Sequence, residues 1–220
     1  MAIYSSLSSI ITFGGMLLHI LYIIAITAEA MTAALSAGRR NMDWVGVCII
    51  AWVTALGGGT IRNILLGHYP MTWVAHPEYL LITAGGAIFA GLIASFMGRL
   101  RMLFLYLDAL GLVVFTIIGC QVAQEMQLSF IIVMLSGMIT GCAGGVLRDV
   151  LCNDIPLLFH KEIYASAAIV TGAIYLGIEA LGGSVHLATV IAAVAGLVLR
   201  LLAIRFRWQM PKFVYQEEWH

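Results

Sequence analysis

The sequence has few charged residues. Asp, Glu, Lys and Arg together make up 10% of its 220 residues, whereas 62% are hydrophobic. A soluble domain carries roughly 25% charged residues, and one of this size cannot hide so much apolar surface from water. Acidic and basic residues are equal in number, 11 of each, so net charge gives no reason to expect a nucleic-acid partner. The composition favours a protein whose solvent is the lipid bilayer.

Motifs typical of enzymes and metal sites are also missing. The sequence has no zinc-binding motif, P-loop, dinucleotide fingerprint or nucleophile elbow. No CxxC pair occurs among its four cysteines, which we interpret as small apolar packing residues: Cys48, Cys120, Cys142 and Cys152. We therefore expect no enzymatic activity, no cofactor and no fixed metal site.

Basic residues are absent from the start of the chain, where the first is Arg39. This start lacks the charged region of a secretory signal peptide, so we expect the first apolar stretch to be retained as a membrane helix. A spanning helix needs about 20 mostly apolar residues. Seven stretches qualify and predict an all-α polytopic membrane protein: 12–35, 43–66, 79–98, 102–123, 129–151, 163–181 and 186–206.

Lys and Arg are absent from three of the connections between these stretches, at 67–78, 124–128 and 182–185. If the N-terminus is outside, all three connections are outer. The inner side then receives Arg39, Arg40, Arg99, Arg101, Lys161, Arg205, Arg207 and Lys212. Because Lys and Arg concentrate in cytoplasmic loops, we predict an outer N-terminus and a cytoplasmic C-terminus.

The sequence overlays on itself when it is shifted by 86 residues. The segment Gly58-Gly59-Thr60-Ile61-Arg62-Asn63 falls on Gly144-Gly145-Val146-Leu147-Arg148-Asp149, and Pro70 falls on Pro156. Each copy holds three spans, so the second copy enters the membrane from the other side, as in many transporters and some channels. This predicts a three-helix repeat at 1–100, an inverted three-helix repeat at 101–185, and a seventh helix with a cytoplasmic tail at 186–220.

Glycine clusters interrupt the second and fifth predicted helices, at Gly57, Gly58 and Gly59 and at Gly144 and Gly145. In one interpretation they break both helices near the midplane, so that freed carbonyls form the narrow part of a pore. In the other they allow close helix packing. Small residues at four-residue spacing support packing: Ala51, Ala55 and Gly59, and their counterparts Gly137, Gly141 and Gly145.

Charged and polar residues also lie inside the apolar stretches: Glu29, Arg62, Asn63, Asp108, Arg148 and Asp149. An unpaired charge at membrane depth costs about 2.5–3.5 kcal/mol on insertion scales. We therefore expect Glu29 or Asp108 to pair with Arg62 or Arg148 across the repeats. Such a pair is either a static link or a pathway or gating charge. Arg200, near the end of the last stretch, is expected to reach the inner interface.

The two Gly-Gly-x-x-Arg motifs and the segment Asp108-Ala109-Leu110-Gly111 resemble those of prokaryotic trimeric intracellular cation (TRIC) channels. These are also described as bacterial proteins with paired glycine transporter domains. The resemblance covers nearly the whole chain. It implies a bacterial or archaeal plasma-membrane protein with three plus three plus one helices. It also implies a homotrimer with one pore per protomer.

The same resemblance implies permeation by monovalent cations, chiefly K⁺, along a path lined by kinked second and fifth helices. These roles fall on the glycine clusters and on Arg62 and Arg148. K⁺ or Na⁺ would then pass near the glycines. The first copy departs from the second in having Asn63 where the second has Asp149.

Three functions remain open at this point. A potassium-permeable channel is favoured by the resemblance. A secondary transporter for a small neutral solute such as glycine is favoured by inverted repeats alone. A membrane scaffold without transport is the third. The inner basic residues also suggest a bound anionic lipid.

Overall fold

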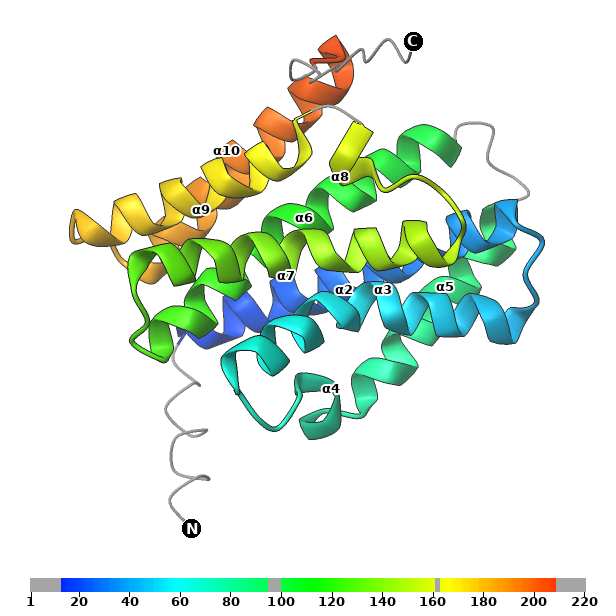
Figure 1. The fold of residues 1–220 in the computed structure, drawn as a ribbon, viewed down its shortest axis with the longest axis horizontal. Coiled ribbons are helices and arrows are strands. Elements are labelled where there is room, and N and C mark those ends of the chain that lie inside the picture. The colour runs from blue at the N-terminus through cyan, green and yellow to red at the C-terminus, as the bar shows by residue number, and fades with distance from the viewer. Residues whose placement is uncertain (1–12, 95–99, 161–162, 209–220) are drawn as a thin grey trace, which may run out of the picture.

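The computed structural model describes residues 13–94, 100–160 and 163–208, and all regular structure in these ranges is helical (Figure 1). Two short helices, α4 (Thr72–Ala75) and α8 (Leu157–His160), lie in connections. The longer helices follow the predicted spans: α2 (Phe13–Arg39), α3 (Trp44–Leu66), α5 (Glu78–Ala94), α6 (Leu100–Glu125), α7 (Phe130–Leu151), α9 (Tyr164–Ala180) and α10 (Val185–Phe206). The prediction of an all-helical protein is confirmed.

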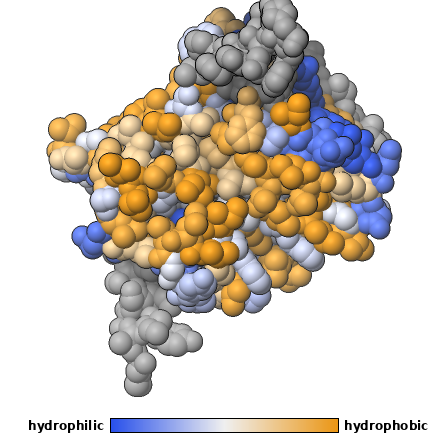
Figure 2. Space-filling view, viewed as in Figure 1, coloured by the Kyte–Doolittle hydropathy of each residue, from blue (hydrophilic) through white to orange (hydrophobic). Residues whose placement is uncertain are grey.

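The helices are apolar on the outside as well as between one another. Five of them are long and apolar enough to cross a membrane, namely α2, α3, α6, α7 and α10. The apolar helices α5 and α9 have 17 residues each, which is about 25 Å of helix against a hydrocarbon core of about 30 Å. Apolar side chains cover much of the face seen in Figure 2, and large ones such as Leu81, Phe89 and Ile131 are exposed. The chain is a polytopic membrane protein.

The helix boundaries repeat along the chain with the same period of 86 residues. Helix α5 runs from 78 to 94 and α9 from 164 to 180. Helices α3 and α7 begin at 44 and 130, and α2 and α6 end at 39 and 125. When 86 is added to the described helix boundaries of the first half, they agree within one residue with those of their counterparts in the second half, and this includes α4 and α8.

The packing of the helices repeats as well (Figure 1). Helix α2 packs against α3 and α5, and α6 packs in the same way against α7 and α9. The two sets meet where α2 contacts α6 and where α3 contacts α7. Helix α10, which has no counterpart, packs against α9 and α6. The residues of the glycine motifs therefore lie at the contact between the two sets.

Helices α3 and α7 run without interruption through their glycine clusters. The start of α3 is capped by Asp43, whose carboxylate accepts a hydrogen bond from the Gly46 amide at 2.7 Å. Its end is set by Gly67, which has a left-handed φ of 66°. The prediction that Gly57–59 and Gly144–145 break the helices is wrong, because neighbouring helices pack against these segments and no backbone is released.

Candidate functional site

Helices α3 and α7 cross in backbone contact at Gly58 and Gly144. A Cβ atom added to Gly58 would collide with the carbonyl oxygen of Thr140, and one added to Gly144 would collide with that of Thr54. Thr54 and Thr140 are 86 residues apart, as are Gly58 and Gly144, so the two contacts are reciprocal. The two glycine clusters therefore meet between the halves, and at Gly58 and Gly144 the contact leaves no room for a side chain.

Small residues elsewhere on α7 serve the same purpose against α6. A Cβ on Gly137 would lie 2.8 Å from the Thr116 carbonyl oxygen, and one on Gly141 would lie 2.7 Å from that of Leu112. The interpretation of this stripe as a packing surface is confirmed. Gly59 differs, because a Cβ there would lie 3.8 Å from Arg62 Nη2, which is an ordinary contact.

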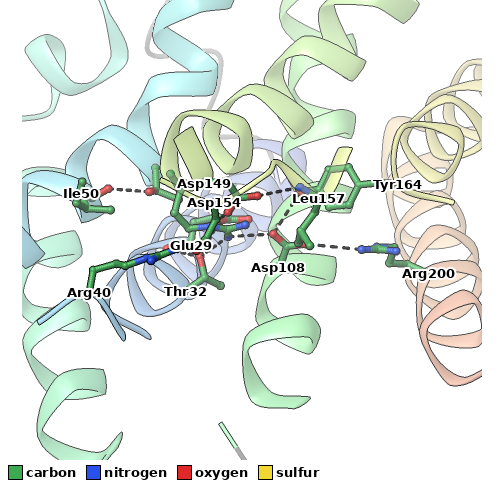
Figure 3. A network of polar contacts seen from close by, with 12 residues as sticks. Glu29, Thr32, Arg40, Ile50, Asp108, Asp149, Asp154, Leu157, Tyr164 and Arg200 are labelled. Carbon is green, nitrogen blue, oxygen red and sulfur yellow. Dashed lines mark hydrogen bonds and ion pairs between the residues drawn. The ribbon is translucent and has the colours of Figure 1, made fainter. Parts of the chain in front are cut away.

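A buried charge cluster near the crossing is centred on Arg148, and Figure 3 shows its acidic members Glu29, Asp108 and Asp149. Its Nη1 lies 3.0 Å from Asp108 Oδ1 and 3.6 Å from Glu29 Oε2. Its Nε lies 2.8 Å from Asp149 Oδ1. The predicted pairing of Glu29 or Asp108 with an arginine of the repeats is confirmed for Arg148, which contacts both. Since Glu29 belongs to α2 and Arg148 to α7, this cluster joins the two halves.

Neutral groups complete the surroundings of this cluster. Thr32 accepts a hydrogen bond from Arg148 Nη1 at 2.9 Å, and its hydroxyl lies 3.1 Å from Glu29 Oε2. The guanidinium also lies 4.5 Å from the ring centroid of Phe104, within the range of cation–π contacts. On α6, Gly111 leaves the space that the Glu29 side chain fills. Sequence reasoning included Gly111 in a motif but found no signal for Thr32 or Phe104.

Arg200 brings α10 to the same cluster, contrary to expectation. Its side chain is fully buried, and its Nη2 lies 3.9 Å from Asp108 Oδ2. The guanidinium also lies 4.7 Å from the ring centroid of Tyr164, whose hydroxyl donates to Asp108 Oδ1 at 3.3 Å. Figure 3 shows Arg200 extending from α10 toward Asp108. The expectation that Arg200 reaches the interface is wrong, because a buried carboxylate draws it inward.

Arg62 occupies the place equivalent to Arg148 in the first half, but its partners are neutral. It is 4% exposed, and its Nε and Nη2 both donate to Asn63 Oδ1, at 2.9 and 2.7 Å. Within the described ranges no carboxylate oxygen lies within 4.0 Å of it. The predicted ion pairing therefore does not extend to Arg62.

Two hollows enter the protein from opposite ends of the helices. One of about 260 Å³ is lined by His19, near the start of α2, and by Arg62 and Thr140. The other, of about 400 Å³, is lined by Arg39, at the end of α2, and by Asp149. On α7, Gly144 lies between Thr140, which lines the first hollow, and Asp149, which lines the second.

An ion pair bridges two connections beside the second hollow. Arg40, after α2, contacts the carboxylate of Asp154, after α7, and donates to the Asn153 carbonyl at 3.0 Å (Figure 3). Both Asn153 and Asp154 line this hollow. The pair lies at the surface, with side-chain exposures of 40% and 44%, so this contact contributes about 0–1 kcal/mol to stability.

Comparison with known proteins gives matches along most of the chain. The family described as "Glycine transporter" matches residues 19–95 and 105–180, once in each half. A UPF0126 membrane protein of Vibrio cholerae is 37% identical over 198 residues, which are 90% of this chain and 83% of that protein. The UPF0126 inner membrane protein YadS of Escherichia coli is 35% identical over 204 residues, covering 92% and 99% of the two chains.

A solved structure is also similar to most of the chain. It is a TRIC trimeric intracellular cation channel orthologue from Rhodobacter sphaeroides, with a TM-score of 0.83 and 32% sequence identity. The match covers 86% of this chain and 98% of that one.

Proposed function

Because the chain belongs to the TRIC family of paired glycine transporter domains, we propose that it is a potassium-permeable cation channel with one pore in each protomer. The matched family and structure are named for transport, and the chain is not an enzyme. The observation that carries the proposal is the pair of hollows at opposite ends of the helices, which Thr140 and Asp149 line on either side of Gly144 in α7.

The proposed path joins the two hollows along the contact between α3 and α7. In the present conformation Gly58 and Gly144 close it by backbone contact. Conduction then requires α3 and α7 to separate at this point. Glycines suit such a contact because they leave no interlocked side chains between the helices. The buried cluster at Arg148 holds α2, α6, α7 and α10 together on one side of the path while this contact changes.

We further infer seven spans arranged as two inverted three-helix repeats and a seventh helix. The boundaries that repeat with a period of 86 residues support this, as do the reciprocal contacts of α3 and α7. The similarity to a channel named as trimeric supports a homotrimer in the bilayer. The relative YadS, named as an inner membrane protein, supports the plasma membrane as the location. We also propose that anionic lipid binds at the side of the protein that carries the predicted inner Lys and Arg residues.

Flux measurements separate the proposed channel from a transporter. Purified protein in potassium-loaded liposomes should release K⁺ down its gradient at a rate that rises without saturation over a wide concentration range. The alternative, a secondary transporter for a small neutral solute such as glycine, predicts saturable glycine uptake and no K⁺ conductance. A scaffold predicts neither. Glycine uptake without K⁺ flux would overturn the channel proposal.

We predict an outer N-terminus and a cytoplasmic C-terminus. The ends of α2 and α10 and the start of α6 share one apolar cluster that includes Leu35, Phe104 and Ile204, so Arg39 and Arg205 lie at the same end of the protein. Three of the predicted inner residues lie outside the described ranges: Arg99, Lys161 and Lys212. A cytoplasm-active reporter fused after residue 220 should be active. Activity only of an externally active reporter at that position would contradict the orientation.

A further inference from the structure

We propose that the hollow at Arg62 is a binding site for a short-chain carboxylate, which pairs with the buried Arg62 guanidinium. The inference concerns the ligand of this hollow, and it holds whether the protein conducts ions or transports a solute. It rests on three properties of the site: an arginine that no carboxylate contacts in the described part of the chain, neutral residues at the positions of all three carboxylates of the equivalent site, and a lining suited to a small organic anion.

Arg62 is buried and carries a charge that its protein partners do not neutralise. Asn63 accepts hydrogen bonds from Nε and Nη2 through one amide oxygen, which leaves Nη1 without a hydrogen-bond acceptor in the described part of the chain. The acid of α6 near this hollow, Glu125, instead accepts a hydrogen bond from Gln121 at 3.2 Å. A buried charge is costly unless it is paired. An anion in the hollow would supply the missing partner.

The equivalent site in the second half shows what Arg62 lacks. There Arg148 contacts the carboxylates of Asp108, Glu29 and Asp149. The residues at the positions related by 86 are Tyr22, Phe115 and Asn63 respectively. The first half thus has the arginine but a neutral side chain at each of the three carboxylate positions. One free carboxylate would restore the kind of contact that the protein itself provides to Arg148.

The lining of the hollow fits a small organic anion. Arg62, Tyr22, Phe115 and Trp73 all line it, and its volume is about 260 Å³. The rings of Tyr22 and Phe115 have centroids 6.1 Å apart, so two neighbouring aromatic rings form part of the wall that Arg62 also lines. An apolar site with a few well-placed polar groups is typical of small-molecule pockets. A guanidinium also matches the planar geometry of a carboxylate.

Binding can be measured on the purified full-length protein without any flux assay. Sodium acetate, exchanged for sodium chloride at constant ionic strength, should raise the Tm of the protein and change its tryptophan fluorescence, to which Trp73 in the lining contributes, in a saturable manner. Acetamide, a neutral molecule of the same size, should do neither. In Arg62→Gln the apparent Kd for acetate should rise by about tenfold or more, because a hydrogen bond to a charged group is worth at least that factor.

A second variant keeps the test decisive if Arg62→Gln does not fold. Asn63→Asp places a carboxylate against Arg62, as Asp149 does for Arg148, and should raise the apparent Kd for acetate by a similar factor. Arg205→Gln, at the exposed end of α10, is the control and should bind acetate like the parent. Equal responses to acetate and acetamide, or no loss of binding in Asn63→Asp, would overturn the proposal. Binding of decanoate but not acetate would also overturn it, since the carboxylate would then come from a lipid.

Discussion

Gly58→Ala is expected to lower the free energy of unfolding by about 1–3 kcal/mol, the usual cost of overpacking a tight contact. The added methyl group would meet the carbonyl oxygen of Thr140 on α7. A backbone carbonyl cannot move aside as a flexible side chain can, so the helices must separate. The same separation should favour a connection between the two hollows and raise K⁺ flux per folded protein. Denaturation with sodium dodecyl sulfate and liposome flux would measure the two effects.

Gly59→Ala is the matched control for this substitution. It lies one residue further along α3, where the methyl group would meet no atom closer than 3.8 Å. Alanine also favours the helix over glycine by up to about 1 kcal/mol. We expect Gly59→Ala to be neutral or slightly stabilising and, because it leaves the crossing closed, not to raise flux. If both alanine variants behaved alike, the crossing at Gly58 and Gly144 would not be the closed contact that we describe.

Arg148→Met is expected to destabilise the protein by about 3–5 kcal/mol, the cost of removing one partner from a buried ion pair. Methionine fills much of the same volume but leaves Glu29, Asp108 and Asp149 close together without their shared cation. Adding Asp108→Asn to Arg148→Met should restore part of the loss, because one of the uncompensated carboxylates is then removed. Detergent denaturation of the two variants and of Asp108→Asn alone gives a double-mutant cycle.

The surface pair of Arg40 and Asp154 supplies the control for this cycle. Arg40→Met removes a cation of the same kind at an exposed ion pair and should cost no more than about 1 kcal/mol. A loss in Arg148→Met as small as that in Arg40→Met would show that the cluster does not hold the helices together. Additive effects of Arg148→Met and Asp108→Asn would show that the two side chains are not coupled.

Much of the fold could be predicted because the bilayer restricts it. Long apolar stretches gave the helices, and the shift of 86 residues predicted which helices are counterparts. The cost of a lone charge in an apolar surrounding predicted that Glu29 or Asp108 pairs with Arg62 or Arg148, and the structure shows that Arg148 is the partner of both acids. In each case a physical requirement of the bilayer narrowed the possible structures to a few.

The break at the glycines could not be decided from the sequence, because the same residues allow either unwinding or close approach. The choice depends on whether another backbone lies against the glycine, and Thr140 and Thr54 supply that backbone here. Arg200 was placed wrongly for a similar reason. Its distance from the helix end allows it to reach the interface, but Asp108 and Tyr164 on other helices bring it inward. The different partners of Arg62 and Arg148 likewise could not be predicted, because they depend on contacts between residues of four helices.

The most direct test of the account is the current through single proteins in a planar bilayer with a tenfold gradient of KCl. A channel with a cation path between α3 and α7 predicts unitary current steps that reverse near the equilibrium potential of K⁺. Gly58→Ala should increase the time spent in the open level, and Gly59→Ala should match the parent. Absence of unitary steps, or reversal near the equilibrium potential of Cl⁻, would contradict the account.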